Sequence, residues 1–300
     1  MHTSFQTTNG KGLDRNSFPM KLWEKAKKYG IWNPINLDFS QDRLDFKKLD
    51  ELEQKFILQP IAQFQAGEEA VTLDLLPLIM AVAKEDRLEE EMFLTSFLWE
   101  EAKHVDGFNR FFNTILDNQI PDMGHLLVPS YKTLFYEILP EVMDALTHDP
   151  SPVNQAKASV TYNMIIEGTL AETGYYGLNY TLGMLDIMPG MLDFTVKLKQ
   201  DESRHVAYGI YLISRLVSEN GEEVWKAVEQ QMNMLLPLAI GVVDEGYKLF
   251  DEIPFGIDPQ IFNDYAMDQF QKRFARIQKA RNQSMTEVLQ DSLSSETLSV

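Results

Sequence analysis

The stretch FLWEEAKHVDGF, residues 97–108, decides the fold of this 300-residue chain. Glu101 and His104 lie three residues apart within it, and Phe97, Val105 and Phe108 surround them at helical spacings. Side chains at positions i and i+3 share one face of a helix. The spacing therefore predicts a helix that carries a carboxylate and an imidazole on its apolar side.

The same Glu-x-x-His spacing recurs at Glu202 and His205, in a chain with only five histidines. Each motif follows a glutamate on an earlier apolar stretch. Glu68 lies 33 residues before Glu101, and Glu167 lies 35 residues before Glu202. This repeated order matches the ligand set of a carboxylate-bridged dimetal site inside a four-helix bundle.

Four carboxylates in one apolar core require positive charge, because an unpaired buried charge is costly or takes up a proton. Two divalent cations would balance them. A single Glu is usually solvated and a single buried His is usually a core residue, but the repeated spacing favours a joint site. The predicted ligands are Glu68, Glu101 and His104 for one metal, and Glu167, Glu202 and His205 for the other.

Among these ligands, Glu101 and Glu202 are the candidates to bridge the two metals or to change binding mode. Their neighbourhood contains further carboxylates. Glu69 and Glu100 point off the ligand-bearing faces and are expected at the surface or in a second layer around the ligands.

The composition restricts the possible partners. A net charge of −18 argues against binding to nucleic acid or to an anionic membrane. The chain has no cysteine, so oxygen and nitrogen ligands remain, and these suit Mn and Fe. Residues 1–18 lack an apolar signal-peptide core, and the longest apolar run, 235–243, is far shorter than the ~20 residues that span a bilayer. We therefore expect a cytoplasmic protein.

The periodicity predicts an all-α protein with no strand pattern, in which residues 1–300 form a single domain. The bundle core is expected over about 60–250, with a flexible arm at 1–18 and a flexible tail at 284–300. Ser40 is expected to be a helix N-cap. Helices are predicted over 19–29, 41–56, 60–84, 88–116, 131–146, 152–185, 191–217, 222–250 and 259–281.

Four segments carry a resemblance to a known family. They are AGEEAVT (66–72), EAKH (101–104), SVTYNMIIEG (159–168) and DESRH (201–205). From about Trp32 to Phe250 the chain resembles ribonucleotide reductase small subunits of the ferritin-like superfamily. It is more similar still to the ligand-binding oxidases that branch from that group.

The resemblance implies a Mn/Fe or di-iron cofactor that activates O2, with Mn on the Glu68 side and Fe on the Glu167 side. It also implies a long-chain fatty acid bound at the metals, a homodimer, and an ether cross-link between Val71 and Tyr162. Spacing supports Val71, which is i+3 from Glu68. Tyr162 lies five residues before Glu167, and in an ideal α-helix the two side chains would point in different directions. The closeness of Tyr162 to the metals is therefore implied by the resemblance alone.

One further feature comes with this resemblance, and another comes from the glycines alone. Trp32 and Asp201 match the electron route of the reductase subunit. The route would carry electrons from an unidentified reductant to His104. Alternatively, Asp201 only fixes the tautomer of the His104 imidazole. Glycines at 168, 174 and 177 predict either a distorted segment with space for an acyl chain or close helix packing.

Three functions remain open on this fold: an oxidase acting on a lipid-like ligand, a reductase small subunit that generates a radical, and a bundle that only oxidises or stores metal. A reductase subunit is disfavoured because Phe108 replaces the usual radical tyrosine, and because no Tyr or Trp follows Tyr265 to export a radical. A fatty-acyl desaturase fits the segments around Trp32 and Val71 less well. A ferritin-like metal-storage bundle does not require the helices after residue 220. An oxidase acting on a lipid-like ligand is therefore favoured.

Overall fold

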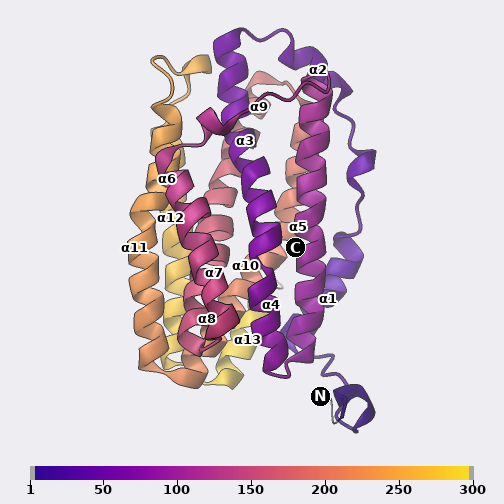
Figure 1. Cartoon of the computed structure of the whole chain (residues 1–300), viewed down its shortest axis with the longest axis vertical. Coiled ribbons are helices and arrows are strands. Elements are labelled where there is room, and N and C mark those ends of the chain that lie inside the picture. The colour runs from indigo at the N-terminus through magenta and orange to yellow at the C-terminus, as the bar shows by residue number, and fades with distance from the viewer. Residues whose placement is uncertain (1–3, 297–300) are drawn as a thin grey trace.

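The computed structural model describes residues 4–296, and helices dominate it without any strand in that range. Four long helical segments run side by side along the length of the molecule (Figure 1). They are α3 (Glu51–Asp74), α5 (Leu88–Ile115), the continuous segment from α8 (Pro152–Ser159) through η5 (Val160–Ala171) to α9 (Glu172–Leu185), and α10 (Pro189–Asn220). These segments form the bundle that carries all four predicted ligand stretches, which confirms the all-α ferritin-like fold.

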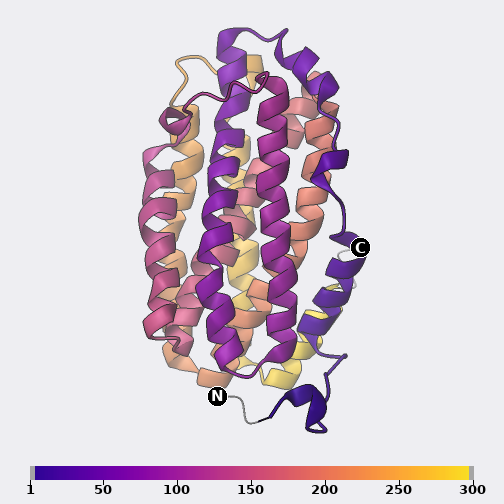
Figure 2. The same cartoon turned by 45° about the vertical axis from the view of Figure 1, so that its right-hand side comes forward.

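The remaining helices cover the bundle on two sides (Figures 1 and 2). On one side α11 (Glu222–Tyr247) and α12 (Gln260–Gln278) pack against η5, and α7 (Leu139–His148) packs against α4 (Leu76–Lys84). On the other side α1 (Phe18–Tyr29) packs along α5. The short segments α2 (Ser40–Phe46), α6 (Pro129–Lys132) and η4 (Thr133–Ile138) connect these helices.

The helix boundaries before the site differ from the prediction. The helix expected at 60–84 begins earlier, at Glu51, where Asp50 and Glu53 form a capping box with two hydrogen bonds of 2.9 Å. It runs through Pro60 and ends at Asp74, and Pro77 lies in the first turn of the next helix. Ser40 is the first helical residue and makes no N-cap hydrogen bond.

The C-terminal segment also differs, because residues 285–296 form helix α13 (Met285–Glu296) where the sequence analysis expected a flexible tail. Ser284 and Glu287 cap its start, and the Ser284 backbone N–H donates to Glu287 at 2.8 Å. Val288 is buried, and the helix packs on α10 and α1. The last residues of the predicted tail, 297–300, lie outside the described part of the chain, as do residues 1–3 of the predicted arm.

The N-terminal arm contacts the bundle at the start of α5. The Gln6 side chain and the Asp14 backbone N–H both donate to the Glu89 carboxylate at 2.9 Å. Within the described range, no helix is long and apolar enough to cross a membrane.

Candidate metal centre

All six predicted metal ligands meet in the middle of the bundle. Glu68 comes from α3, Glu101 and His104 from α5, Glu167 from η5, and Glu202 and His205 from α10. Their exposed fractions lie between 0 and 6%. Six polar side chains from four helices therefore share one buried site.

The donor atoms form two overlapping groups. In one, donors of Glu68, Glu101, His104 and Glu202 lie within 4.8 Å of one another, and in the other, donors of Glu101, Glu167 and His205 do so. His104 Nδ1 lies 3.6 Å from Glu101 and 3.5 Å from Glu202, and His205 Nδ1 lies 3.2 and 3.4 Å from the same two carboxylates. Glu101 and Glu202 therefore lie between the imidazoles, where a bridging carboxylate belongs.

The donor chemistry fits two divalent cations. Nδ1 of His104 and of His205, one oxygen of Glu167 and one of Glu202 are buried and have no hydrogen-bond partner among the described residues. Buried polar atoms are normally satisfied. Carboxylates and imidazoles are ligands of Mn and Fe, so metal ions between these atoms would satisfy them.

The titration behaviour shows the same excess of negative charge. Burial raises the pKa of Glu68, Glu167 and Glu202 above the ordinary value of 4.5. Burial disfavours protonated His104 and His205, but the surrounding carboxylates outweigh it and hold both pKa values well above 6.5. In the metal-free protein, protons therefore supply part of the charge that metals would supply.

A second layer of charged residues orients both imidazoles. His104 Nε2 lies 3.3 Å from Asp201, and His205 Nε2 lies 2.9 Å from Glu100. The Arg204 guanidinium donates to both carboxylates, at 2.5 Å to Asp201 and 2.6 Å to Glu100. Each histidine is thus held by the residue that precedes the ligand glutamate of the other motif, which fixes the ring orientation and leaves Nδ1 for a metal.

Glu100 is fully buried in this second layer, whereas Glu69 is exposed. The sequence alone is compatible with either residue at the surface or in a second layer around the ligands. A repeat in the sequence carries the missing signal: in both Glu-x-x-His motifs an acid precedes the Glu, and a base, Lys103 or Arg204, precedes the His.

Tyr162 is fully buried beside the ligands, and its hydroxyl donates to Glu101 at 3.1 Å. An ideal α-helix would turn Tyr162 away from the direction of Glu167, but this segment is not an ideal α-helix. Residues 160–171 form a π-helix, whose hydrogen bonds join positions i and i+5. A side chain five residues before Glu167 therefore lies one turn away on the same side.

Val71 lies on the same cavity as Glu68 and is 5% exposed. It belongs to the same buried hydrophobic cluster as Tyr162. The structure therefore places both predicted cross-link residues in the apolar surroundings of the site.

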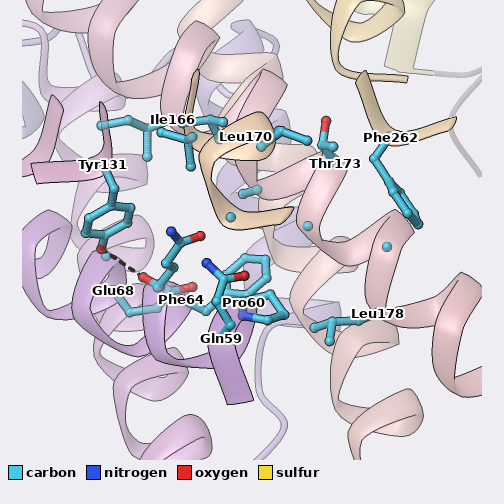
Figure 3. A pocket seen from close by; sticks show the side chains of 18 of the residues that line it. Gln59, Pro60, Phe64, Glu68, Tyr131, Ile166, Leu170, Thr173, Leu178 and Phe262 are labelled. Carbon is cyan, nitrogen blue, oxygen red and sulfur yellow. Dashed lines mark hydrogen bonds between the residues drawn. The ribbon is translucent and has the colours of Figure 1, made fainter. Parts of the chain in front are cut away.

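A cavity leads away from the carboxylates between α3, η5, α9 and α11. Its volume is about 160 Å³, on a scale where one water molecule needs about 10–15 Å³. Glu68, Glu101, Glu167 and Glu202 lie at one end. Figure 3 shows part of the remaining lining, which is mainly apolar and includes Phe64, Ile166, Leu170, Leu178 and Phe262.

The predicted glycine cluster divides between the two expected roles. Gly174 and Gly177 line the cavity, whereas Gly168 lies against Arg273. A Cβ at Gly174 would lie 2.5 Å from Phe64 Cζ, but one at Gly177 would come no closer than 3.5 Å to Phe262. Gly174 therefore permits close packing at the cavity wall, whereas a methyl group at Gly177 would make only ordinary van der Waals contact with Phe262.

Trp32 lies beside the second layer at the surface side of α5. Its indole N–H donates to Asp201 at 2.9 Å, and its ring is stacked on His104 with centroids 6.2 Å apart. The buried Lys103 ammonium lies 4.1 Å from the Trp32 ring centroid and donates to Asp201 at 2.9 Å. The three residues of the predicted electron route are thus in contact.

Two Glu-x-x-His motifs and two further glutamates, one ligand group on each bundle helix, define the class of carboxylate-bridged dinuclear metal proteins. Comparison with known proteins agrees: the family model described as "Ribonucleotide reductase, small chain" matches residues 18–270. The chain belongs to this family, in its branch of R2-like ligand-binding oxidases.

Two solved structures represent that branch. The R2-like ligand-binding oxidase from Sulfolobus acidocaldarius is 37% identical, with a TM-score of 0.88 over 96% of this chain and 99% of that one. A tyrosine-to-phenylalanine variant of an R2-like ligand-binding oxidase, with an aerobically reconstituted Mn/Fe cofactor, is 40% identical. Its TM-score is 0.87, over 92% of this chain and 98% of that one.

Proposed function

We propose that this protein is an O2-dependent oxidase with one Mn and one Fe ion, or alternatively two Fe ions. The Mn ligands are Glu68, Glu101 and His104, and the Fe ligands are Glu167, Glu202 and His205, with Glu101 and Glu202 between the ions. The observation that carries this proposal is the pair of overlapping donor groups with free Nδ1 atoms. The Mn/Fe cofactor of similar oxidases supports the metal pair.

When bound, the reduced metals would supply two of the four electrons that reduce O2 to two water molecules. We propose that Val71 and Tyr162 supply the other two by forming an ether bond. A C–H bond of Val71 and the O–H bond of Tyr162 break, and a C–O bond forms. Two protons come from these residues and two from solvent.

The surroundings of Tyr162 suit this role. Burial, together with the charge of Glu101, raises the pKa of the phenol well above its ordinary value of 10. Tyr162 therefore keeps its proton at neutral pH and holds it toward Glu101, at 3.1 Å. The apolar cluster around Val71 excludes water from the reacting carbon.

The ligand of the cavity, in this proposal, is a long-chain fatty acid. Its carboxylate would bind at the metal end, where the ions offset the charge of four glutamates, and its chain would lie along the apolar wall. The mainly apolar lining of the cavity, which includes Phe64 and Phe262, supports an acyl chain.

Electrons would enter through Trp32 and Asp201 to His104, from a reductant that remains to be found. The indole–carboxylate hydrogen bond and the ring stacking support this route. We also propose a homodimer, and the exposed apolar side chains of Leu73 and Met80 offer surface for it.

A radical-generating reductase subunit is the competing function. Phe108 occupies the position of the radical tyrosine, where it is fully buried and packed on Phe64 and Phe194 with ring centroids 5.4 and 4.8 Å apart. That site offers no oxidisable phenol, so the structure favours the oxidase.

Peptide mass mapping tests the proposed oxidase. The protein is loaded with Mn and Fe without oxygen and digested before and after exposure to air. A joined peptide containing Val71 and Tyr162, lighter by two hydrogens than its parts, is expected only after exposure. Tyr162→Phe is the control that binds metals without forming the bond. Full metal occupancy with separate peptides in the wild-type protein would reject the cross-link.

A further inference from the structure

Tyr208 is a buried tyrosine of α10 that the proposed oxidase function does not use. It is 0% exposed, and its hydroxyl donates to Glu90 at 3.0 Å. Glu90 is 3% exposed and lies 3.4 Å from the guanidinium of Arg215, which is itself 1% exposed. A phenol, a carboxylate and a guanidinium thus form a polar cluster inside the core.

Aromatic contacts join this tyrosine to the metal site. Tyr208 follows His205 by three residues on α10, a rise of about 4.5 Å. The ring of Phe97 is stacked on His205 with centroids 3.6 Å apart, and Phe93 lies 6.1 Å from Phe97 and 5.1 Å from Tyr208. Contacts between aromatic rings therefore run without interruption from a candidate metal ligand to the Tyr208 phenol.

The charges around Glu90 favour uptake of one proton. Three carboxylates, Glu85, Glu90 and Glu219, share two guanidiniums, Arg87 and Arg215. This cluster has one negative charge in excess, so protonation of Glu90 makes it neutral. Arg215 would still form ion pairs with Glu85 and Glu219, at 3.3 and 3.2 Å. Burial also raises the pKa of Glu90, which makes it a stronger base than an ordinary glutamate.

The other buried tyrosines near the site lack such a base. The hydroxyls of Tyr162 and Tyr175 donate to Glu101 and Glu202, whose charge bound metals would neutralise. The Tyr131 hydroxyl donates to the Gln63 backbone carbonyl at 2.8 Å, as Figure 3 shows, and a carbonyl cannot keep a proton. Tyr208 has a carboxylate partner outside the metal ligands.

We propose that Tyr208 and Glu90 form a proton-coupled redox pair that returns one electron to the O2-oxidised metal centre through Phe93, Phe97 and His205. The Tyr208 O–H bond breaks, its electron reduces one oxidised metal ion, and its proton moves to Glu90. A neutral phenoxyl radical and a neutral carboxylic acid result. The pair acts when no two-electron substrate is present, and it rests on the proposed oxidase function.

The test uses Tyr162→Phe protein, in which the cross-link cannot supply electrons. Protein with ring-deuterated tyrosine, loaded with Mn and Fe, is mixed with O2 and frozen at a series of times for electron paramagnetic resonance. Metal oxidation is followed in parallel by optical absorption. We expect a tyrosyl signal, narrowed by the deuterium, that disappears when Tyr208→Phe is added and persists when Tyr131→Phe is added.

Glu90→Gln tests the base separately, because glutamine still accepts the hydrogen bond but cannot take the proton. It is expected to slow radical formation by about 100-fold or more, the lower range for loss of a positioned base. Metal oxidation without a Tyr208 signal would overturn this inference alone, as would a signal that survives Tyr208→Phe. Metals that do not oxidise would overturn the oxidase function and this inference with it.

Discussion

Replacing the two second-layer carboxylates separately should weaken the two metal sites separately. Glu100→Gln removes the charge that holds His205 Nε2 at 2.9 Å, and Asp201→Asn removes the charge beside His104 Nε2 at 3.3 Å. Each variant keeps the shape of the side chain. The first variant should affect the Glu167–His205 site, and the second should affect the Glu68–His104 site.

The magnitude follows from the interactions that each substitution removes. Each carboxylate holds one imidazole and accepts a hydrogen bond from Arg204 of 2.5–2.6 Å. Removal of such a partner typically costs 10–100-fold in metal affinity, or about 1.4–2.7 kcal/mol. Because Arg204 contacts both carboxylates, the affinity decrease in the double variant should be smaller than the two single effects combined.

Equilibrium dialysis against a graded series of chelators, with element analysis, measures both affinities. Glu69→Gln is the matched control, because Glu69 is exposed next to a ligand and should leave both affinities unchanged. Equal weakening of both sites by each variant would refute the crossed arrangement of second-layer partners. So would weakening by the control variant alone.

Three other predictions concern packing and protons. Gly174→Ala should lower the free energy of unfolding by about 1–3 kcal/mol, because its methyl carbon would lie 2.5 Å from an aromatic ring carbon of α3. Gly177→Ala has room and should be neutral or stabilising by up to about 1 kcal/mol; urea denaturation that ranks the two variants the other way would contradict this. Burial raises the pKa of Asp74 from 3.8 to about 6, so its ionisation weakens folding as the pH rises through that range. Asp74→Asn should therefore stabilise the protein at pH 7 by about 1 kcal/mol, a value reduced for the partial exposure of Asp74. The substitution should have no effect below about pH 4. Equal effects on stability at both pH values in urea denaturation would contradict the raised pKa of Asp74. Since the pKa values of His104 and His205 are raised in the metal-free protein, metal binding should release protons and weaken as the pH falls. Calorimetry in buffers of different ionisation enthalpy counts these protons, and a count of zero would contradict the charge balance described above.

Regular periodicity made the bundle and its six ligand positions predictable. Glu101 and His104 are i and i+3 on a regular helix, so spacing alone places them together. Local hydrogen bonding altered the geometry at Tyr162. The π-helix at 160–171 packs closely on α10, where a Cβ at Gly209 would lie 2.2 Å from Asn163. Such a tertiary contact leaves no periodic signal in the sequence.

The start of α3 and the helix α13 were mispredicted because two signals in the sequence disagreed at each place. Proline usually starts a helix, but Pro60 is carried inside α3 between the buried Ile57 and Ile61. The polar composition after Ser284 suggested a flexible tail, whereas the Ser284–Glu287 capping box and the buried Val288 favour a helix. The average composition of this segment does not reveal a capped, amphipathic helix such as α13.

The most direct test of the dinuclear centre is a crystal structure of the metal-loaded protein with anomalous data on both sides of the Mn and Fe absorption edges. Two peaks are expected between the imidazoles of His104 and His205, with Glu101 and Glu202 contacting both. The Mn signal should lie on the His104 side and the Fe signal on the His205 side. A single ion, or ions bound away from these carboxylates, would contradict the account.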